Sequence, residues 1–333
     1  MQKKILLFAH DPGGANTIIP LIDFLKKKYD VVLFGKNMAL KRYREFGYQG
    51  HDITSVIDDS TQEKITDFLY ALQPAVVVTG TSATDKTEKY LWRASEQLSI
   101  PSCAILDQWM NYGIRFSAYG VDKIDAYKVD KTHAFVPTRI CVMDDYAREQ
   151  TLLEGIAGDR VVVTGQPYFD FVQVRKNMLS IDKILALKKS LYGDIDMLIT
   201  FASEPFSLIF KDNNYLGYTE QTILQALIES LTAIVQLSQK KIILVVRPHP
   251  KEDLVYYQNI IASHKISLLK IVIEKYPFRG RSYADIRFSL WYVFHVFIGS
   301  NFIEYSYLEC TNRLKNSRSV YSLSSWFYKN GLG

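Results

Sequence analysis

The stretch KILLFAHDPGGANTIIPLIDFLKKK, residues 4–28, decides the fold class. It begins with a continuous apolar run, passes through a glycine-rich segment and continues from Asn16 with helix-like spacing of apolar residues. An apolar run of this length is typical of a parallel strand that is covered on both faces. The stretch therefore predicts a strand, a tight turn and a helix, which is the repeating unit of a doubly wound α/β domain.

The same alternation of apolar runs and amphipathic segments continues along the chain. The predicted strands of a first domain, residues 1–170, are 4–9, 31–35, 75–80, 102–106, 139–143 and 160–165. A charged helical connector, residues 174–193, precedes a second series of segments. The predicted strands of this series are 196–202, 241–246 and 268–274, with a long helix at 219–239. We expect two Rossmann-like domains, the second over residues 171–286 and incomplete.

Composition and charge limit the class of protein. The chain has 333 residues, 48% of them hydrophobic, which is enough for two packed domains. No apolar run reaches the length of a membrane span, and Cys103, Cys141 and Cys310 are too scattered for a disulfide framework or a zinc site. We expect a cytoplasmic protein. The net charge of +5 suits an anionic substrate, and it leaves peripheral contact with the inner face of a membrane as an alternative.

The segment after the first predicted strand holds the first candidate site. Ligands of open α/β sheets bind outside the carboxyl ends of the strands, and a helix N-terminus favours anions. We expect His10 and Asp11 to be catalytic, because they can orient or deprotonate a hydroxyl. Gly13, Gly14 and Asn16 would contact an acceptor, with the glycines allowing close approach to the backbone. The alternative is a tight turn with a capping Asp. The glycine pattern is not that of a dinucleotide site.

A second candidate loop, residues 106–116, follows the strand predicted at 102–106. It carries a carboxylate, an aromatic ring, an amide and a guanidinium on Asp107, Trp109, Asn111 and Arg115. Binding pockets commonly hold a ligand with aromatic side chains and a few placed polar groups, and sugars suit such a set. We therefore expect these four residues to bind the acceptor, and the alternative is a surface loop with an anchoring Trp.

The second domain carries the strongest signal, LVVRPHPKE at residues 244–252. Its two prolines stop the strand and stiffen the loop, and they leave Arg247 and His249 at the strand end. A guanidinium and an imidazole suit a phosphate or diphosphate. Ser203 and Glu204 end the strand predicted at 196–202, so we expect all four residues to bind the donor. The alternative is a charged loop after a strand.

Two doubly wound domains with Arg-Pro-His-Pro in the second resemble the GT-B fold. Residues 3–283 are similar to bacterial GT-B glycosyltransferases of capsule and other surface-polysaccharide synthesis. The likeness to CDP-glycerol glycerophosphotransferases and to non-hydrolysing UDP-GlcNAc 2-epimerases is weaker. The resemblance implies that the first domain takes a glycan or lipid-linked acceptor and that the second takes a nucleotide-diphosphate sugar. Nucleic acid is not an expected partner, because no basic stripe with interleaved aromatics is present.

The expected activity is inverting sugar transfer without a cofactor or an obligatory metal. His10 or Asp11 would take the acceptor proton, and Arg247 and His249 would stabilise the leaving diphosphate. Asp194 and Asp196 precede a strand, so we interpret them as solvated turn carboxylates rather than metal ligands. The first alternative is a UDP-sugar 2-epimerase, which should have several carboxylates and His residues in its cleft. The second is a non-catalytic, truncated product.

The last part of the chain differs from the rest in composition. From Asp285 onward there is no Ala, Pro, Gln or Met, and 12 of the 46 residues from Phe288 onward are aromatic, against 13% overall. The donor site of the resembling families also needs a late loop of small residues followed by a helix with a Glu. This sequence lacks that motif.

A one-base shift of the reading frame explains both features. Synonymous codons chosen from Arg287 onward, when read one base later, encode a strand end, a glycine-containing loop and a helix with a Glu. The only codon of Trp291 is TGG, and the T that starts the Tyr292 codon turns it into GGT, a glycine. We therefore expect residues 287–333 to be an out-of-frame tail that impairs the chain. The alternative is a divergent aromatic extension.

The tail hypothesis predicts a difference between this chain and a frame-restored one. The restored chain should melt at a higher temperature and gain further stability with UDP- or CDP-linked ligands. The chain as given should not, because its second sheet would keep an unpaired edge. Thermal melting with and without ligand measures both. Equal ligand-dependent stabilisation of the two chains would show that the tail is a genuine part of the enzyme.

Overall fold

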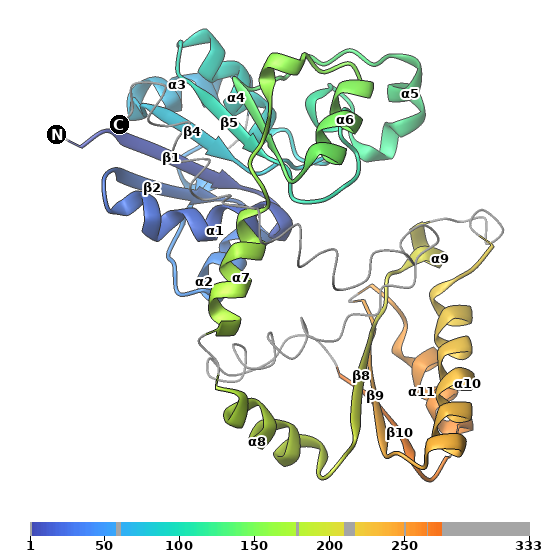
Figure 1. Cartoon of the computed structure of the whole chain (residues 1–333). Helices are drawn as coiled ribbons and strands as arrows, with labels where there is room; N and C mark the ends of the chain where they lie inside the picture. Colours follow the sequence, from blue (N-terminus) through green and yellow to red (C-terminus); the bar gives the residue numbers. More distant parts are fainter. Residues whose placement is uncertain are drawn as a thin grey trace. The chain divides into compact units, whose positions relative to one another are not determined.

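The computed structural model of the protein describes residues 2–57, 61–177, 180–209, 217–249, 251–264 and 266–274 (Figure 1). Backbone contacts divide the chain into two compact units, with the division between Val172 and Gln173. Both units are α/β with parallel sheets, which confirms the predicted fold class. The tail predicted at residues 287–333 lies outside the described residues.

The sheet of the first unit is parallel and has the strand order β3-β2-β1-β4-β5-β6-β7. Its strands are β1 (Lys4–Ala9), β2 (Asp30–Gly35), β3 (His51–Asp52), β4 (Val76–Thr79), β5 (Ser102–Ile105), β6 (Arg139–Val142) and β7 (Val161–Val163). Six of these were predicted, while β3 pairs over only two residues and gives no sequence pattern. The first-predicted strand, β1, lies inside the sheet between β2 and β4.

Helices connect these strands and cover both faces of the sheet (Figure 1). They are α1 (Pro12–Lys26), α2 (Met38–Glu45), α3 (Gln62–Leu72), α4 (Thr87–Gln97), α5 (Ile124–Val129) and α6 (Asp145–Leu153). The next helix, α7 (Pro167–Asn177), follows β7 and spans the division between the two units. The first helix begins at Pro12, so Gly13 and Gly14 belong to its first turn. The turn between β1 and the helix is therefore shorter than predicted. Proline suits the first position of a helix, because the N–H group that it lacks would have no helical partner there.

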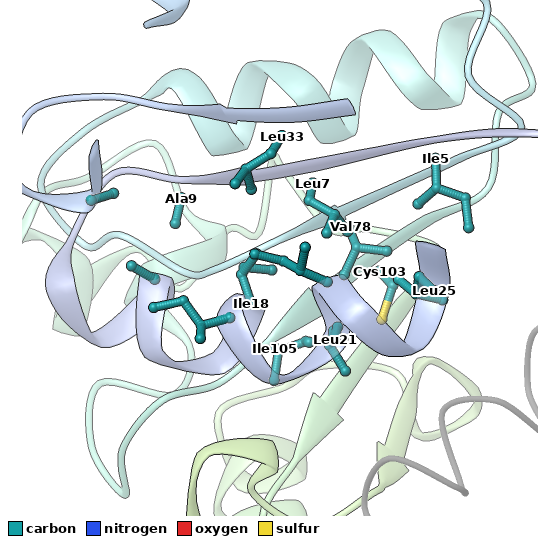
Figure 2. Packing of buried hydrophobic residues seen from close by; sticks show 14 of the residues in the cluster. Ile5, Leu7, Ala9, Ile18, Leu21, Leu25, Leu33, Val78, Cys103 and Ile105 are labelled. Atoms are coloured by element: carbon teal, nitrogen blue, oxygen red, sulfur yellow. The ribbon is translucent and has the colours of Figure 1, made fainter. Parts of the chain in front are cut away.

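The core of the first unit explains why residues 5–9 of β1 are all apolar. Ile5, Leu7 and Ala9 pack toward α1, against a cluster that includes Ile18, Leu21, Leu25 and Val78 (Figure 2). Leu6 and Phe8 point to the opposite face, where they meet residues of α3 and α4. Successive side chains of a strand alternate between faces, so a strand covered on both sides has no polar position.

The second unit has a parallel sheet with the order β10-β9-β8 among its described residues. Its elements are α8 (Ile181–Tyr192), β8 (Met197–Ala202), α9 (Phe206–Ile209), α10 (Glu220–Ser238), β9 (Ile242–Arg247), α11 (Leu254–Ser263) and β10 (Leu269–Ile273). Thr219 caps α10 in a reciprocal arrangement with Thr222, as its residue type predicts. Among the helices of the described ranges, none combines the length and apolar character needed to cross a membrane.

Two glycines let the segments after β1 and β4 touch. A Cβ placed on Gly80 would lie 2.7 Å from the Cα of Gly14 and 3.1 Å from Oε1 of Glu88. Because the nearest atom is backbone, no side-chain rotation relieves this overlap. The first turn of α1 and the segment after β4 can therefore pack together only while Gly80 has no side chain.

The substitution Gly80→Ala should destabilise the protein by about 1–3 kcal/mol, as is typical of overpacking. Gly158→Ala is a matched control, because its Cβ would meet only Leu152, at an ordinary 3.5 Å. Urea unfolding followed by circular dichroism measures both variants. Equal free energies of unfolding for the two would contradict the close contact.

Candidate active site

The carboxyl edge of the first sheet brings together residues that are far apart in the sequence. Ala9 is in register with Gly35 of β2, and Phe8 is in register with Thr79 of β4. The backbone continues these pairings past the strand ends, since Lys36 N donates to Ala9 O at 3.1 Å. The residues that follow β1, β2 and β4 therefore lie side by side, with His10 in the middle.

The His10 ring contacts polar groups at both nitrogens. Its Nδ1 lies 2.7 Å from Oδ1 of Asp11, and its Nε2 lies 3.1 Å from Nδ2 of Asn37 and 3.8 Å from Oδ2 of Asp85. Burial by itself lowers the pKa of His10, but the hydrogen bond with Asp11 and the charges of Asp11, Asp85 and Glu88 outweigh it and raise the pKa. The imidazole is therefore a stronger base than an ordinary histidine.

Asp11 orients this imidazole. Burial would raise the pKa of Asp11, but hydrogen bonds with His10 and Ser82 lower it below the usual range. An ionised carboxylate only accepts hydrogen bonds, so the neutral ring donates its Nδ1 proton to Asp11 and keeps a lone pair on Nε2. Asp11 makes no capping hydrogen bond to α1, so the alternative of a purely capping Asp is wrong.

Glu88 in the first turn of α4 is a buried carboxyl group that joins two strand ends. It accepts hydrogen bonds from the backbone N–H of His10, at 3.3 Å, and from that of Ser82. Its side chain is fully buried, and this burial raises its pKa to about 8. Glu88 cannot touch a substrate, but it fixes the backbone on which the imidazole stands.

Several residues of this cluster were not predicted from the sequence. They are Lys36, Asn37, Ser82, Asp85 and Glu88. Each follows a predicted strand, at 31–35 or 75–80, just as His10 follows the strand at 4–9. Their position was therefore visible in the sequence, although the order of the strands, which brings them next to His10, was not.

The loop after β5 uses its charged residues inside the protein. Arg115 is 2% exposed, and its guanidinium donates to Oδ1 of Asp107 at 2.8 Å and to Oγ1 of Thr81 at 2.7 Å. The other carboxylate oxygen of Asp107 fills the space beside Gly13, where a Cβ would lie only 1.9 Å away. The structure thus gives Arg115 and Gly13 roles in joining β5 to α1, and their predicted acceptor contacts stay predictions.

Two other predicted acceptor residues also have internal partners. Trp109 donates from Nε1 to Oδ2 of Asp144 at 2.9 Å and stacks on Phe169, yet 36% of it is exposed. Asn16 accepts from Nε of Arg42 at 2.7 Å. Trp109 is therefore both an anchored residue and an accessible aromatic surface.

Asn111 has a positive φ of 58°, a conformation that Asn adopts more readily than most residues.

The second unit brings together three of its predicted donor residues. Ser203 N donates to Arg247 O at 2.9 Å, so β8 and β9 end side by side. Glu252, which was not predicted, accepts from the hydroxyls of Ser203 at 2.7 Å and Tyr257 at 2.8 Å, and from the backbone N–H of His249. The carboxylate thereby braces the loop that carries His249. Glu204 lies next to Ser203 and is exposed.

Solved structures share this fold. The UDP-GlcNAc 2-epimerase from Methanocaldococcus jannaschii has 17% identity and a TM-score of 0.55, covering 86% of this chain and 76% of that one. The enzyme from Neisseria meningitidis, bound to UDP-GlcNAc, has 14% identity and a TM-score of 0.55, covering 85% and 74%. Anabaena HepE, in complex with UDP-glucose, has 13% identity and a TM-score of 0.51, covering 84% and 70%.

These likenesses show the fold. No protein-family profile matches the sequence, and no curated protein matches it significantly. At identities of 13–17%, the structural neighbours establish that the chain has a GT-B-like fold, as the sequence predicted. A shared fold does not determine the substrate or the reaction, which depend on the residues of the site.

The raised pKa of Glu88 predicts a pH dependence of stability. Between pH 4.5, the ordinary pKa, and about 8, the unfolded chain has lost a proton that the folded protein retains. The free energy of unfolding should therefore fall as pH rises through this window and level off above it.

Glu88→Gln has no proton to release at this position, so its free energy of unfolding should fall less steeply over the same window. Urea unfolding at a series of pH values compares the two proteins. Identical slopes in the wild type and the variant would mean that Glu88 titrates normally.

Proposed function

We propose that the protein transfers a sugar from a nucleotide-diphosphate donor to a hydroxyl of a glycan or lipid-linked acceptor. The observation that carries this proposal is the His10–Asp11 pair, 2.7 Å apart at the carboxyl edge of the first sheet. Asp11 binds Nδ1, so Nε2 is the atom that accepts the hydroxyl proton. General-base catalysis of this kind contributes about 10²–10⁴-fold to a rate.

Among the residues that the structure describes at this sheet edge, we assign proton acceptance to His10 alone. The carboxylates near His10 are held by internal partners, since Asp85 pairs with Lys36 at 2.7 Å and Asp107 pairs with Arg115 at 2.8 Å. Inverting sugar transfer needs one base, whereas epimerisation at a carbon needs proton transfer on both faces of the sugar. This difference favours transfer over epimerisation.

The donor side of the proposal rests on the second unit. Arg247 ends β9. The side chain of Glu252 accepts a hydrogen bond from the backbone N–H of His249, two residues after Arg247. These are the cationic and hydrogen-bonding groups that suit a diphosphate. Two of the similar structures were solved with UDP-GlcNAc or UDP-glucose, which supports a UDP-linked sugar as the donor.

A second candidate function is epimerisation of a UDP-linked sugar. The fold comparison favours it, because two of the three similar structures described above are UDP-GlcNAc 2-epimerases. The two functions differ in whether an acceptor is required.

Incubation with UDP-GlcNAc in D₂O separates the two functions. A transferase should release UDP only when a glycan or lipid-linked acceptor is added, and it should leave the carbon-bound hydrogens of the donor unexchanged. An epimerase should produce the 2-epimer without an acceptor and incorporate deuterium at C2. If neither the chain as given nor the frame-restored chain produces either result with UDP- and CDP-linked sugars, both candidates are wrong.

Two substitutions should separate donor binding from proton transfer. Arg247→Ala should weaken nucleotide-diphosphate binding by about 1.5–3 kcal/mol, the usual loss for a charge-assisted hydrogen bond. Asp11→Asn should lower turnover and leave donor affinity nearly unchanged, because it disorients the base. Titration calorimetry and initial rates on the frame-restored chain measure the two effects.

Lys270→Ala is a matched control, since this exposed cation lies in the same sheet as Arg247. It should bind the donor normally. Unchanged affinity in Arg247→Ala would make Arg247 a surface charge only, and an equal loss of donor affinity in Asp11→Asn would reverse the assignment of the two units.

A further inference from the structure

A charged pair lies on the side of His10 opposite to Asp11. Lys36 directly follows β2, and Asp85 lies in the segment between β4 and α4. Their side chains meet at 2.7 Å between Nζ and Oδ2. Because β1 lies between β2 and β4, this pair bridges the two neighbours of the strand that carries His10.

The Asp85 carboxylate is fixed at both oxygens. Oδ1 accepts from the backbone N–H of Thr87 at 2.8 Å, and Oδ2 accepts from Lys36. The Lys36 ammonium also lies 3.4 Å from Oγ1 of Thr87. The Lys36 and Asp85 side chains are only 20% and 15% exposed, so solvent screens their charges less than those of a surface pair. A carboxylate held in this way cannot rotate away from its neighbours.

Oδ2 of Asp85 lies 3.8 Å from Nε2 of His10. This is too long for a direct hydrogen bond, but it is short for two opposite charges. In the proposed transfer, the O–H bond of the acceptor breaks, its electron pair stays on oxygen, and the proton forms a bond with Nε2. The imidazole then carries a positive charge directly opposite the carboxylate.

We propose that Lys36 and Asp85 are positioning residues that set the basicity of His10: Asp85 stabilises the imidazolium, and Lys36 limits this effect by holding the carboxylate. The proposal rests on the proposed function for its reaction, although the electrostatic coupling exists without substrate. Too strong a carboxylate field would keep His10 protonated before the acceptor binds. Lys36 offsets part of that field and keeps Nε2 available.

Other groups near His10 also influence its pKa. Among the described residues, the charged or titratable groups that act on the ring are Asp11, Asp85 and the buried Glu88, and the neutral Asn37 contacts Nε2. Lys36 acts on the ring through its ion pair with Asp85. Burial would raise the pKa of Asp85, but its hydrogen bonds with Lys36 and Thr87 lower it, so the carboxylate is ionised wherever His10 titrates. The shift expected from Asp85 is therefore separable from its own titration.

Nitrogen-15 NMR of the full chain tests the coupling by following the titration of the His10 ring, which is assigned with a His10→Gln variant. Asp85→Asn removes the carboxylate charge, so the pKa of His10 should move to lower pH. Lys36→Met removes the opposing cation, so the pKa should move to higher pH. Lys41→Met, an exposed lysine of α2, should leave it unchanged.

Shifts in opposite directions for Asp85→Asn and Lys36→Met support the proposal, and no shift in either, or the same shift in Lys41→Met, overturns it. Circular dichroism establishes that each variant is folded before it is titrated. The measurement needs no substrate, so failure of the transferase assay would leave the coupling result intact. In an active protein, Asp85→Asn should also move the lower limb of the pH–rate profile to lower pH.

Discussion

The hydrogen bonds of the buried Glu88 carboxyl group hold the first site together. They tie the backbone of His10, after β1, to that of Ser82, after β4. Gly14 and Gly80 allow this close approach because neither carries a side chain. A buried carboxyl group keeps its position only when its oxygens find such donors. The backbone of His10, which positions the imidazole, is therefore fixed before any substrate binds.

Different polar groups contact the two ring nitrogens of His10. Asp11 binds Nδ1 and sets the tautomer, whereas Asn37 and Asp85 face Nε2. The second unit has a comparable arrangement, in which Glu252 braces the loop of His249. In both units, the side-chain carboxyl group of a glutamate holds a histidine-bearing segment at a strand end. Such internal bracing is the usual condition for a preorganised site.

The sequence predicted the parallel strands well, because the part of a strand that is buried on both faces, such as residues 5–9 of β1, is a continuous apolar run. The same reasoning selected His10, Asp11 and Arg247 from their place at the predicted strand ends, and their roles stay predictions. It did not identify Glu88 or Asp85, because their proximity to His10 depends on β4 lying beside β1, which a local pattern does not reveal. For the same reason, the partners of Arg115, which come from β4 and β5, could not be foreseen.

The central claim is that Asp11 holds His10 with its proton on Nδ1, so that Nε2 is the base. The nitrogen-15 chemical shifts of the neutral ring measure this tautomer directly. We expect a protonated Nδ1 and an unprotonated Nε2 in the wild type, with the preference lost in Asp11→Asn. A neutral ring protonated at Nε2, with or without Asp11, would contradict it.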